Sequence, residues 1–204
     1  MKARRQRIAR IVLLYAAYSE HGDEGRFCAA VNACYQKATL ERILKESQGT
    51  TLCATIAALG LVGDSSALAT LGPLLRHADR NVRTRADESL STLCERVGSP
   101  AQKQILNNVS ELNEQGEFEQ AVELSTRWLK TEGAAIELLH QRSLAFFQLD
   151  SIEHAVSDCR EILKLHPYHY QAMVGLAHCH LELGDLLEAV FWYRQAVDTY
   201  PDLE

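Results

Sequence analysis

The sequence predicts an all-α fold, an α-solenoid made of stacked antiparallel helix pairs. Ala121, Ala155 and Ala189 stand 34 residues apart, a step typical of helix–turn–helix units that stack on copies of themselves. The composition agrees, because the 204 residues hold only four prolines and 7% aromatic residues, while the strong helix formers Ala, Leu and Glu are frequent. Arrays of this kind usually hold another molecule on their surface.

The N-terminal segment has two interpretations. Basic residues without an acidic one precede an apolar run over 11–18, namely Lys2, Arg4, Arg5, Arg7 and Arg10. A short leader has this pattern, but the run is at the short limit and no clean cleavage site follows. Helical spacing instead favours a first structural helix, with an apolar face formed by Ile8, Ile11, Val12, Leu14, Tyr15 and Tyr18. We expect the helix and keep the leader as the alternative.

Further helical segments follow in order. Asp23-Glu24 starts a helix, and its apolar positions are Phe27, Ala30, Val31, Cys34 and Tyr35. A more apolar helix around 52–60 ends at Gly63-Asp64. Leucines at 68, 71, 74 and 75 indicate the next helix, and Asp79 opens another.

Residues 50–97 resemble the HEAT repeat family. The resemblance is carried by the string ALGLVGDSSALATLGPLLRHADRNVRTRADESL, with its Leu-Gly, Gly-Asp, Leu-Leu and Asp-x-x-Val-Arg landmarks. It implies that Asp79 and Arg83 have a structural hydrogen-bonding role between neighbouring repeats and that Pro73 kinks its helix. Residues 4–46 would be a divergent first pair. We therefore expect a HEAT-like helical domain over 1–98, with a boundary at Ser99-Pro100.

The second half carries three copies of one unit, over 102–135, 136–169 and 170–203, in a domain that spans 101–204. The last copy is the clearest: a helix over 170–183 ends at Gly184-Asp185, a second helix covers 186–200, and Pro201 follows. The first helix carries Met173, Leu176, Ala177, His180 and Leu181 on successive turns, with His180 packed inward and Leu181 toward the groove described below. In the second helix, Ala189, Tyr193, Ala196 and Val197 are expected to face inward.

These units resemble the tetratricopeptide repeat (TPR) family over residues 102–203. The resemblance implies a right-handed superhelix whose first helices line a concave groove that grips a peptide or a partner helix. The groove positions would be Asn107, Ser110, Glu137, His140, Gln141, Leu144, Phe147, Gln148, Gln171, Val174, His178 and Glu182. One TPR subgroup binds chaperone C-termini with a cationic clamp, but here neutral residues stand at the matching places: Leu106, Ser110, Gln141, Gln171 and Gly175.

The groove composition predicts the kind of partner. Its lining is neutral to acidic around an apolar centre, Leu144 and Phe147, which suits a helix or a mildly basic peptide. The alternative is that these positions face water or a packed neighbour. A second hypothesis is self-association, because no capping helix follows the last pair and its outer face would expose Leu187, Phe191 and Trp192.

The sequence predicts neither an enzyme nor a cofactor. It contains no phosphate-binding glycine loop, no G-x-S-x-G and no H-E-x-x-H. His178 and His180, with His166 and His169 nearby, form the best histidine group. Residues two apart on a helix point to different sides, so we expect no metal site there.

Charge and cysteine usage limit the remaining classes. Residues 1–100 hold 14 Lys/Arg against 10 Asp/Glu, and residues 101–204 hold 7 against 17. Nucleic-acid binding by the basic first half is the least favoured alternative, because no aromatic residues alternate with Arg76, Arg80, Arg83 and Arg85. Six cysteines without a C-x-x-C pair indicate a reducing, cytoplasmic location, and no apolar run is long enough to span a membrane.

Overall fold

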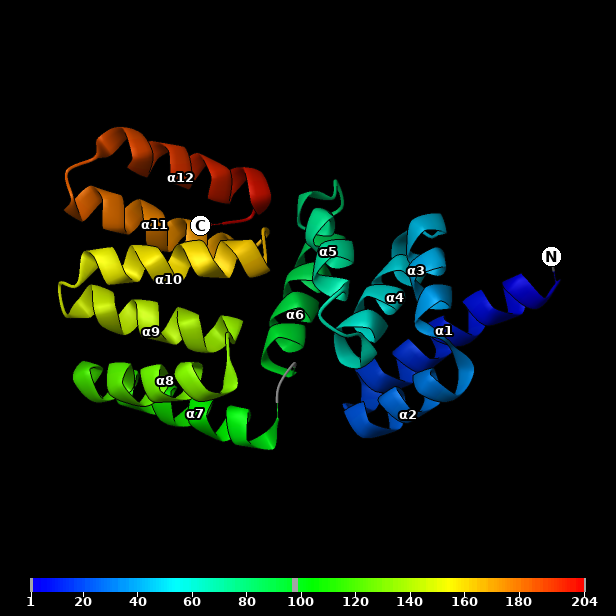
Figure 1. The fold of residues 1–204 in the computed structure, drawn as a ribbon. Coiled ribbons are helices and arrows are strands. Elements are labelled where there is room, and N and C mark those ends of the chain that lie inside the picture. The colour runs from blue at the N-terminus through cyan, green and yellow to red at the C-terminus, as the bar shows by residue number, and fades with distance from the viewer. Residues whose placement is uncertain (1, 97–98, 204) are drawn as a thin grey trace. The chain divides into compact units, whose positions relative to one another are not determined.

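The chain folds into helices throughout the part described. The computed structural model describes residues 2–96 and 99–203, with side chains from residue 10 onward. In these ranges it has twelve α-helices, one short 3-10 helix and no strand, which confirms the predicted all-α class of packed helix pairs (Figure 1). The chain divides into two compact units, Met1–Val97 (unit 1) and Gly98–Glu204 (unit 2).

Unit 1 begins with a long helix. Its elements are α1 (Lys2–His21), α2 (Glu24–Cys34), α3 (Lys37–Glu46), α4 (Gly49–Val62), α5 (Ala67–Leu71), the 3-10 helix η1 (Gly72–Arg76) and α6 (Arg80–Arg96). The backbone of α1 is helical from Lys2, and Ile11 on its apolar face is fully buried. The basic side chains of Lys2, Arg4, Arg5 and Arg7 lie outside the described part, and the leader interpretation stays untested.

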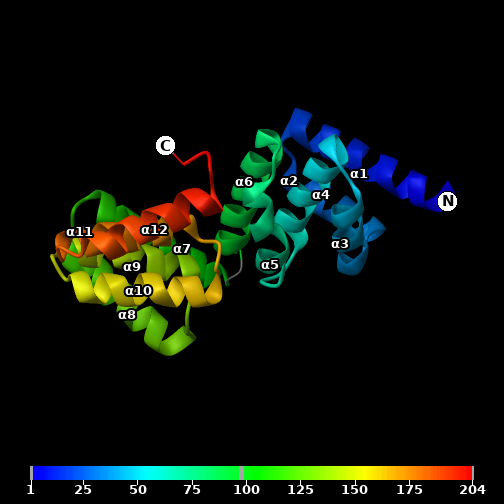
Figure 2. The same cartoon turned by 90° about the horizontal axis from the view of Figure 1, so that it is seen from above.

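Helix α4 is the centre of unit 1. It contains no charged residue, and a helix that is apolar on all sides is stable only when it is buried on all sides. Nine of its 14 residues are buried, and it packs against α1, α2, α3 and α6 (Figure 2). Gly60 allows the closest approach, because a Cβ there would lie 2.6 Å from Ser89 Cβ on α6.

The loop after α4 is held by polar contacts. Lys37 Nζ lies 2.6 Å from Asp64 Oδ1, and the same oxygen accepts the backbone N–H of Ser66 at 2.9 Å. Hydrogen bonds from Lys37 and Ser66 lower the pKa of the Asp64 carboxyl to about 2. Arg96 Nη2 on α6 donates to the carbonyl of Gly63.

One detail of unit 1 differs from what the HEAT resemblance implies. Pro73 does not kink a continuous helix: α5 ends at Leu71, and Pro73 lies in the first turn of η1, where its missing N–H leaves no hydrogen bond broken. Asp79 and Arg83 do make structural hydrogen bonds. Asp79 Oδ1 accepts the N–H of Asn81 at 2.9 Å, and Arg83 Nη1 donates to the His77 carbonyl at 2.8 Å.

Unit 2 consists of three antiparallel helix pairs stacked in chain order (Figure 1). The pairs are α7 (Pro100–Glu114) with α8 (Phe118–Glu132), α9 (Ile136–Gln148) with α10 (Ile152–Leu165), and α11 (Tyr170–Glu182) with α12 (Leu186–Thr199). Each helix contacts mainly its partner and the adjacent pair. The hydrophobic interior is correspondingly divided into clusters between neighbouring helices.

The three turns within the pairs share one geometry. Gly116, Asp150 and Gly184 have φ angles of 78°, 57° and 75°, in the left-handed region that ends many helices. The N–H that follows each of them bonds to the carbonyl five residues earlier, at 2.9, 2.9 and 2.8 Å. The 34-residue step seen in the sequence therefore corresponds to a repeated helix end, and at Asp150 the turn is made without glycine.

The three alanines of the 34-residue step are buried. Ala121, Ala155 and Ala189 are each at most 1% exposed, so adjacent helices approach closely at these points.

Val197 was expected to face inward, but the structure leaves it about half exposed, at 48%. It lies eight residues after Ala189, the first buried residue of its predicted stripe. At 100° per residue, this turns the side chain about 80° away from that position and past the edge of the buried stripe.

Candidate partner-binding face

The twelve predicted groove residues lie on α7, α9 and α11, the first helices of the three pairs. None of the twelve is buried, and α9 contacts both α7 and α11. These three helices therefore present one partly exposed surface, which we call the α7–α9–α11 face.

The centre of this face is aromatic and apolar. The Phe147 ring lies 6.3 Å from the His178 ring, which lies 5.6 Å edge-on from the Tyr193 ring. Leu144 and Leu181 are 45% and 43% exposed. The strip Leu144, Phe147, His178, Leu181 and Tyr193 thus runs from α9 across α11 to α12.

One residue of the strip, Tyr193, was expected to face inward. It is only half-buried, and its ring contacts that of His178. The pattern within α12 cannot reveal this contact, because His178 belongs to another helix.

Gln141 is less available for binding than predicted. Asn113 Nδ2 on α7 donates to both the carbonyl and the Oε1 of Gln141, each at 2.9 Å. Gln141 therefore fits the alternative interpretation, in which a predicted groove residue contacts a packed neighbour. The contact links the first pair to the second along the face.

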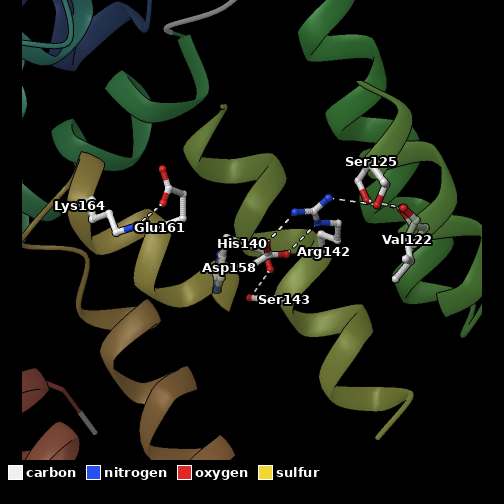
Figure 3. A network of polar contacts seen from close by, with 10 residues as sticks. Val122, Ser125, His140, Arg142, Ser143, Asp158, Glu161 and Lys164 are labelled. Atoms are coloured by element: carbon white, nitrogen blue, oxygen red, sulfur yellow. Dashed lines mark hydrogen bonds and ion pairs between the residues drawn. The ribbon is translucent and has the colours of Figure 1, made fainter. Parts of the chain in front are cut away.

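A buried ion pair holds the helices behind the face. Arg142 Nε and Nη2 donate to the two carboxylate oxygens of Asp158 at 2.8 and 2.7 Å, and Arg142 Nη1 donates to Thr126 Oγ1 at 3.0 Å (Figure 3). One guanidinium on α9 thereby connects α10 and α8. The two side chains are only 16% and 7% exposed. The sequence pattern does not reveal this ion pair, because its two residues lie on different helices.

Glu137 and His140, predicted as groove residues, belong to a cluster with His166 and His169. Glu137 Oε2 lies 4.0 Å from His140 Nδ1, and Glu137 Oε1 lies 3.9 Å from His169 Nε2. The His169 ring lies 5.2 Å from that of His140 and 5.7 Å from that of His166. Four titratable side chains thus meet where the second pair joins the third.

Burial determines the charges in this cluster. It lowers the pKa of His140 and of His166 to about 4, so both imidazoles are neutral at pH 7. Burial also acts to raise the pKa of Glu137, but the facing His169 and the other histidines outweigh it, and this pKa lies below its ordinary value. The contact between His140 and Glu137 is therefore not an ion pair at neutral pH.

The histidines that the sequence singled out lie apart. His178 is exposed and belongs to the aromatic strip, whereas His180 is buried with its Nδ1 3.9 Å from Asp185 Oδ2. The expectation that the two would point to different sides is confirmed. Two sequence signals bear on the actual cluster: His166 and His169 were grouped as neighbours, and the three-residue spacing of Glu137 and His140 places both on one side of a helix.

The predicted association face, Leu187, Phe191 and Trp192, is only partly exposed to solvent. Leu187 and Phe191 are 86% and 48% exposed, but Trp192 is half-buried and packs against the core between the second and third pairs. Leu183, Leu186 and Val190 are also exposed. The exposed apolar patch, which we call the α12 patch, is therefore formed by Leu186, Leu187, Val190 and Phe191 of α12 and by Leu183 at the end of α11.

The family comparison identifies the last helix pair. Residues 170–203 match the family model described as the tetratricopeptide repeat, as predicted for this segment. The match covers α11 and α12, and the two preceding pairs share their turn geometry. Such a repeat indicates a module of protein–protein interaction. In the part of the chain that can be described, no helix is long and apolar enough to cross a bilayer.

Proposed function

We propose that the chain is a non-enzymatic adaptor whose α7–α9–α11 face binds a peptide or a helix of a partner protein. The observation that carries this proposal is the exposed strip from Leu144 to Tyr193. Large apolar and aromatic side chains that remain accessible side by side commonly mark interaction sites. Leu144 and Phe147 are the proposed anchors.

The surrounding charge favours a basic partner segment. Glu137 and Glu182 lie on the same face and are not buried, and residues 101–204 hold 17 Asp/Glu against 7 Lys/Arg. An acidic field attracts basic segments and speeds their association. All six cysteines are thiols, which suits the cytoplasmic location that we propose for this adaptor.

Self-association through the α12 patch is the second candidate. Leu186 and Leu187 are 64% and 86% exposed, and an apolar patch of this kind often marks a contact between proteins. The two candidates use different residues, so one experiment can separate them.

The experiment compares Leu144→Asp with Leu187→Asp. Both leucines are exposed, so neither change opens the core, and circular dichroism should show unchanged helicity. We expect Leu144→Asp to remove the captured partners from a pull-down read by mass spectrometry, while Leu187→Asp keeps them. If Leu144→Asp retains the same partners, the proposed face is wrong.

Light scattering on the same two variants tests the second candidate. A wild-type dimer that Leu187→Asp converts to a monomer supports self-association. A wild-type chain that stays monomeric at high concentration excludes it.

A further inference from the structure

The cluster at the junction of the second and third pairs has the composition of a metal site. The ligand atoms of Glu137, His140 and His169 all lie within 4.8 Å of one another. Zinc bonds of about 2.1 Å in a tetrahedral arrangement need ligand atoms roughly 3.4 Å apart. Glu137 Oε1 lies 3.9 Å from His169 Nε2, and Glu137 Oε2 lies 4.0 Å from His140 Nδ1. With one donor atom from each residue the separations reach up to 4.8 Å, so side-chain rotation must bring the ligand atoms closer by up to about 1.4 Å.

We propose that Glu137, His140 and His169 bind one divalent transition-metal ion of the zinc class. Two imidazoles and one carboxylate are donors that suit zinc. Calcium and magnesium prefer oxygen donors throughout. Three protein ligands leave a fourth position for water or for another side chain.

The ligands come from two rigid elements. Glu137 and His140 lie three residues apart in the first turns of α9, so they share one side of that helix. His169 is the N-cap of α11, where its Nδ1 accepts the N–H of Ala172 at 3.1 Å. This bond orients the ring and leaves Nε2 facing Glu137. An ion bound here would join the second helix pair to the third.

The N-cap bond also limits affinity. Because Nδ1 of His169 accepts a hydrogen bond, the proton of the neutral ring resides on Nε2, where the ion must bind. A metal-bound histidine normally donates its other N–H, so binding must move this proton to Nδ1 and break the capping bond. Loss of one such bond weakens binding by roughly tenfold relative to a site without this conflict.

His166 provides an independent observation. It is 3% exposed, and its Nδ1 has no hydrogen-bond partner among the described residues. A buried polar atom without a partner costs free energy and calls for a water or an ion. Its ring lies 5.7 Å edge-on from that of His169, so the polar interior of the cluster extends beyond the three proposed ligands.

The site is accessible from one side. The side chains of Glu137 and His140 are 22% and 21% exposed, whereas that of His169 is 6% exposed, so an ion can enter from the side of α9.

The test is a zinc titration of the full chain. The protein is treated with a chelator, dialysed, kept reduced and titrated with Zn²⁺ by calorimetry at neutral pH. We expect one saturable site, weakened more than about tenfold by His140→Ala and by Glu137→Gln. His154→Ala is the matched control, because His154 is exposed on α10 and should leave binding unchanged.

Two further measurements separate loss of binding from loss of folding and identify the ligands. Glu137→Gln preserves the shape of the side chain. The midpoint of thermal unfolding, measured for each variant in the presence of chelator, shows that the variant folds. The absorption of bound Co²⁺ distinguishes nitrogen and oxygen ligands from the thiolates that six cysteines could offer. No saturable binding, binding kept by both variants, or a thiolate charge-transfer band would each overturn the proposal.

Discussion

Unit 1 and unit 2 are both helical, but they distribute their cores differently. Unit 1 surrounds one helix, α4, which has nine buried residues. No helix of unit 2 has more than six buried residues, and its pairs are joined by separate clusters and by polar contacts such as Arg142–Thr126 and Asn113–Gln141. The stability of unit 1 should therefore depend on one close contact between helices. The stability of unit 2 should depend on contacts between neighbouring helix pairs.

The largest effect is expected for Asp158→Ala in unit 2. The change leaves the guanidinium of Arg142 buried without its counter-ion, which should lower the free energy of unfolding by about 3–5 kcal/mol. Urea unfolding followed by tryptophan fluorescence measures it, because Trp128 and Trp192 both lie in unit 2. The double variant Arg142→Met/Asp158→Leu is the control and should lower the free energy of unfolding much less. Equal losses of this free energy in both variants would show that the ion pair itself does not hold these helices together.

Gly60 and Gly175 provide a matched pair across the two units. An alanine at Gly60 would place its Cβ 2.6 Å from Ser89 Cβ and 2.9 Å from Ser89 Cα. Because a backbone atom cannot move aside, we expect Gly60→Ala to cost about 2–3 kcal/mol.

Gly175→Ala is the milder member of this pair. Its Cβ would meet only the Sγ of Cys159, at 3.0 Å, and alanine favours the helix by about 1 kcal/mol. We expect a loss below about 1 kcal/mol. Chemical denaturation followed by circular dichroism compares the two variants, and equal losses would refute the contrast between a concentrated and a distributed core.

The smallest effect is a difference in thiol reactivity. Burial raises the pKa of Cys159 to about 12 and that of Cys179 to about 11. At pH 8 the thiolate fraction of Cys159 is then roughly a thousandfold below that of a thiol with pKa 9. We expect iodoacetamide to label the half-buried Cys34 of unit 1 first and these two last, as mapped by mass spectrometry. Early labelling of Cys159 would show that the interior of unit 2 opens readily.

Much of the architecture followed from periodicity. The 34-residue step of the alanines predicted the stacked pairs, and Gly184-Asp185 marked the turn of the last pair. Gly63-Asp64 marked the end of the helix that the structure places at the centre of unit 1. Both signals are local, because a turn or a buried helical side is encoded within a few consecutive residues.

Contacts between helices were not accessible in this way. Arg142–Asp158, Asn113–Gln141 and Glu137–His169 each join residues at least 16 positions apart. A helical pattern shows which side of a helix faces a neighbour, but the crossing angle decides which side chains meet. For the same reason the sequence grouped His166 and His169 with His178 and His180 rather than with Glu137 and His140.

The sequence by itself determined the helices, their turns and the kind of object that they build, because propensity, capping and apolar spacing act along the chain. The tertiary structure alone decided that Val197 lies past the edge of the buried stripe, that Tyr193 joins the exposed strip, and that a carboxylate and three imidazoles meet at one junction. These outcomes depend on how helices pack side by side, which positions residues that are distant in the chain within a few ångströms.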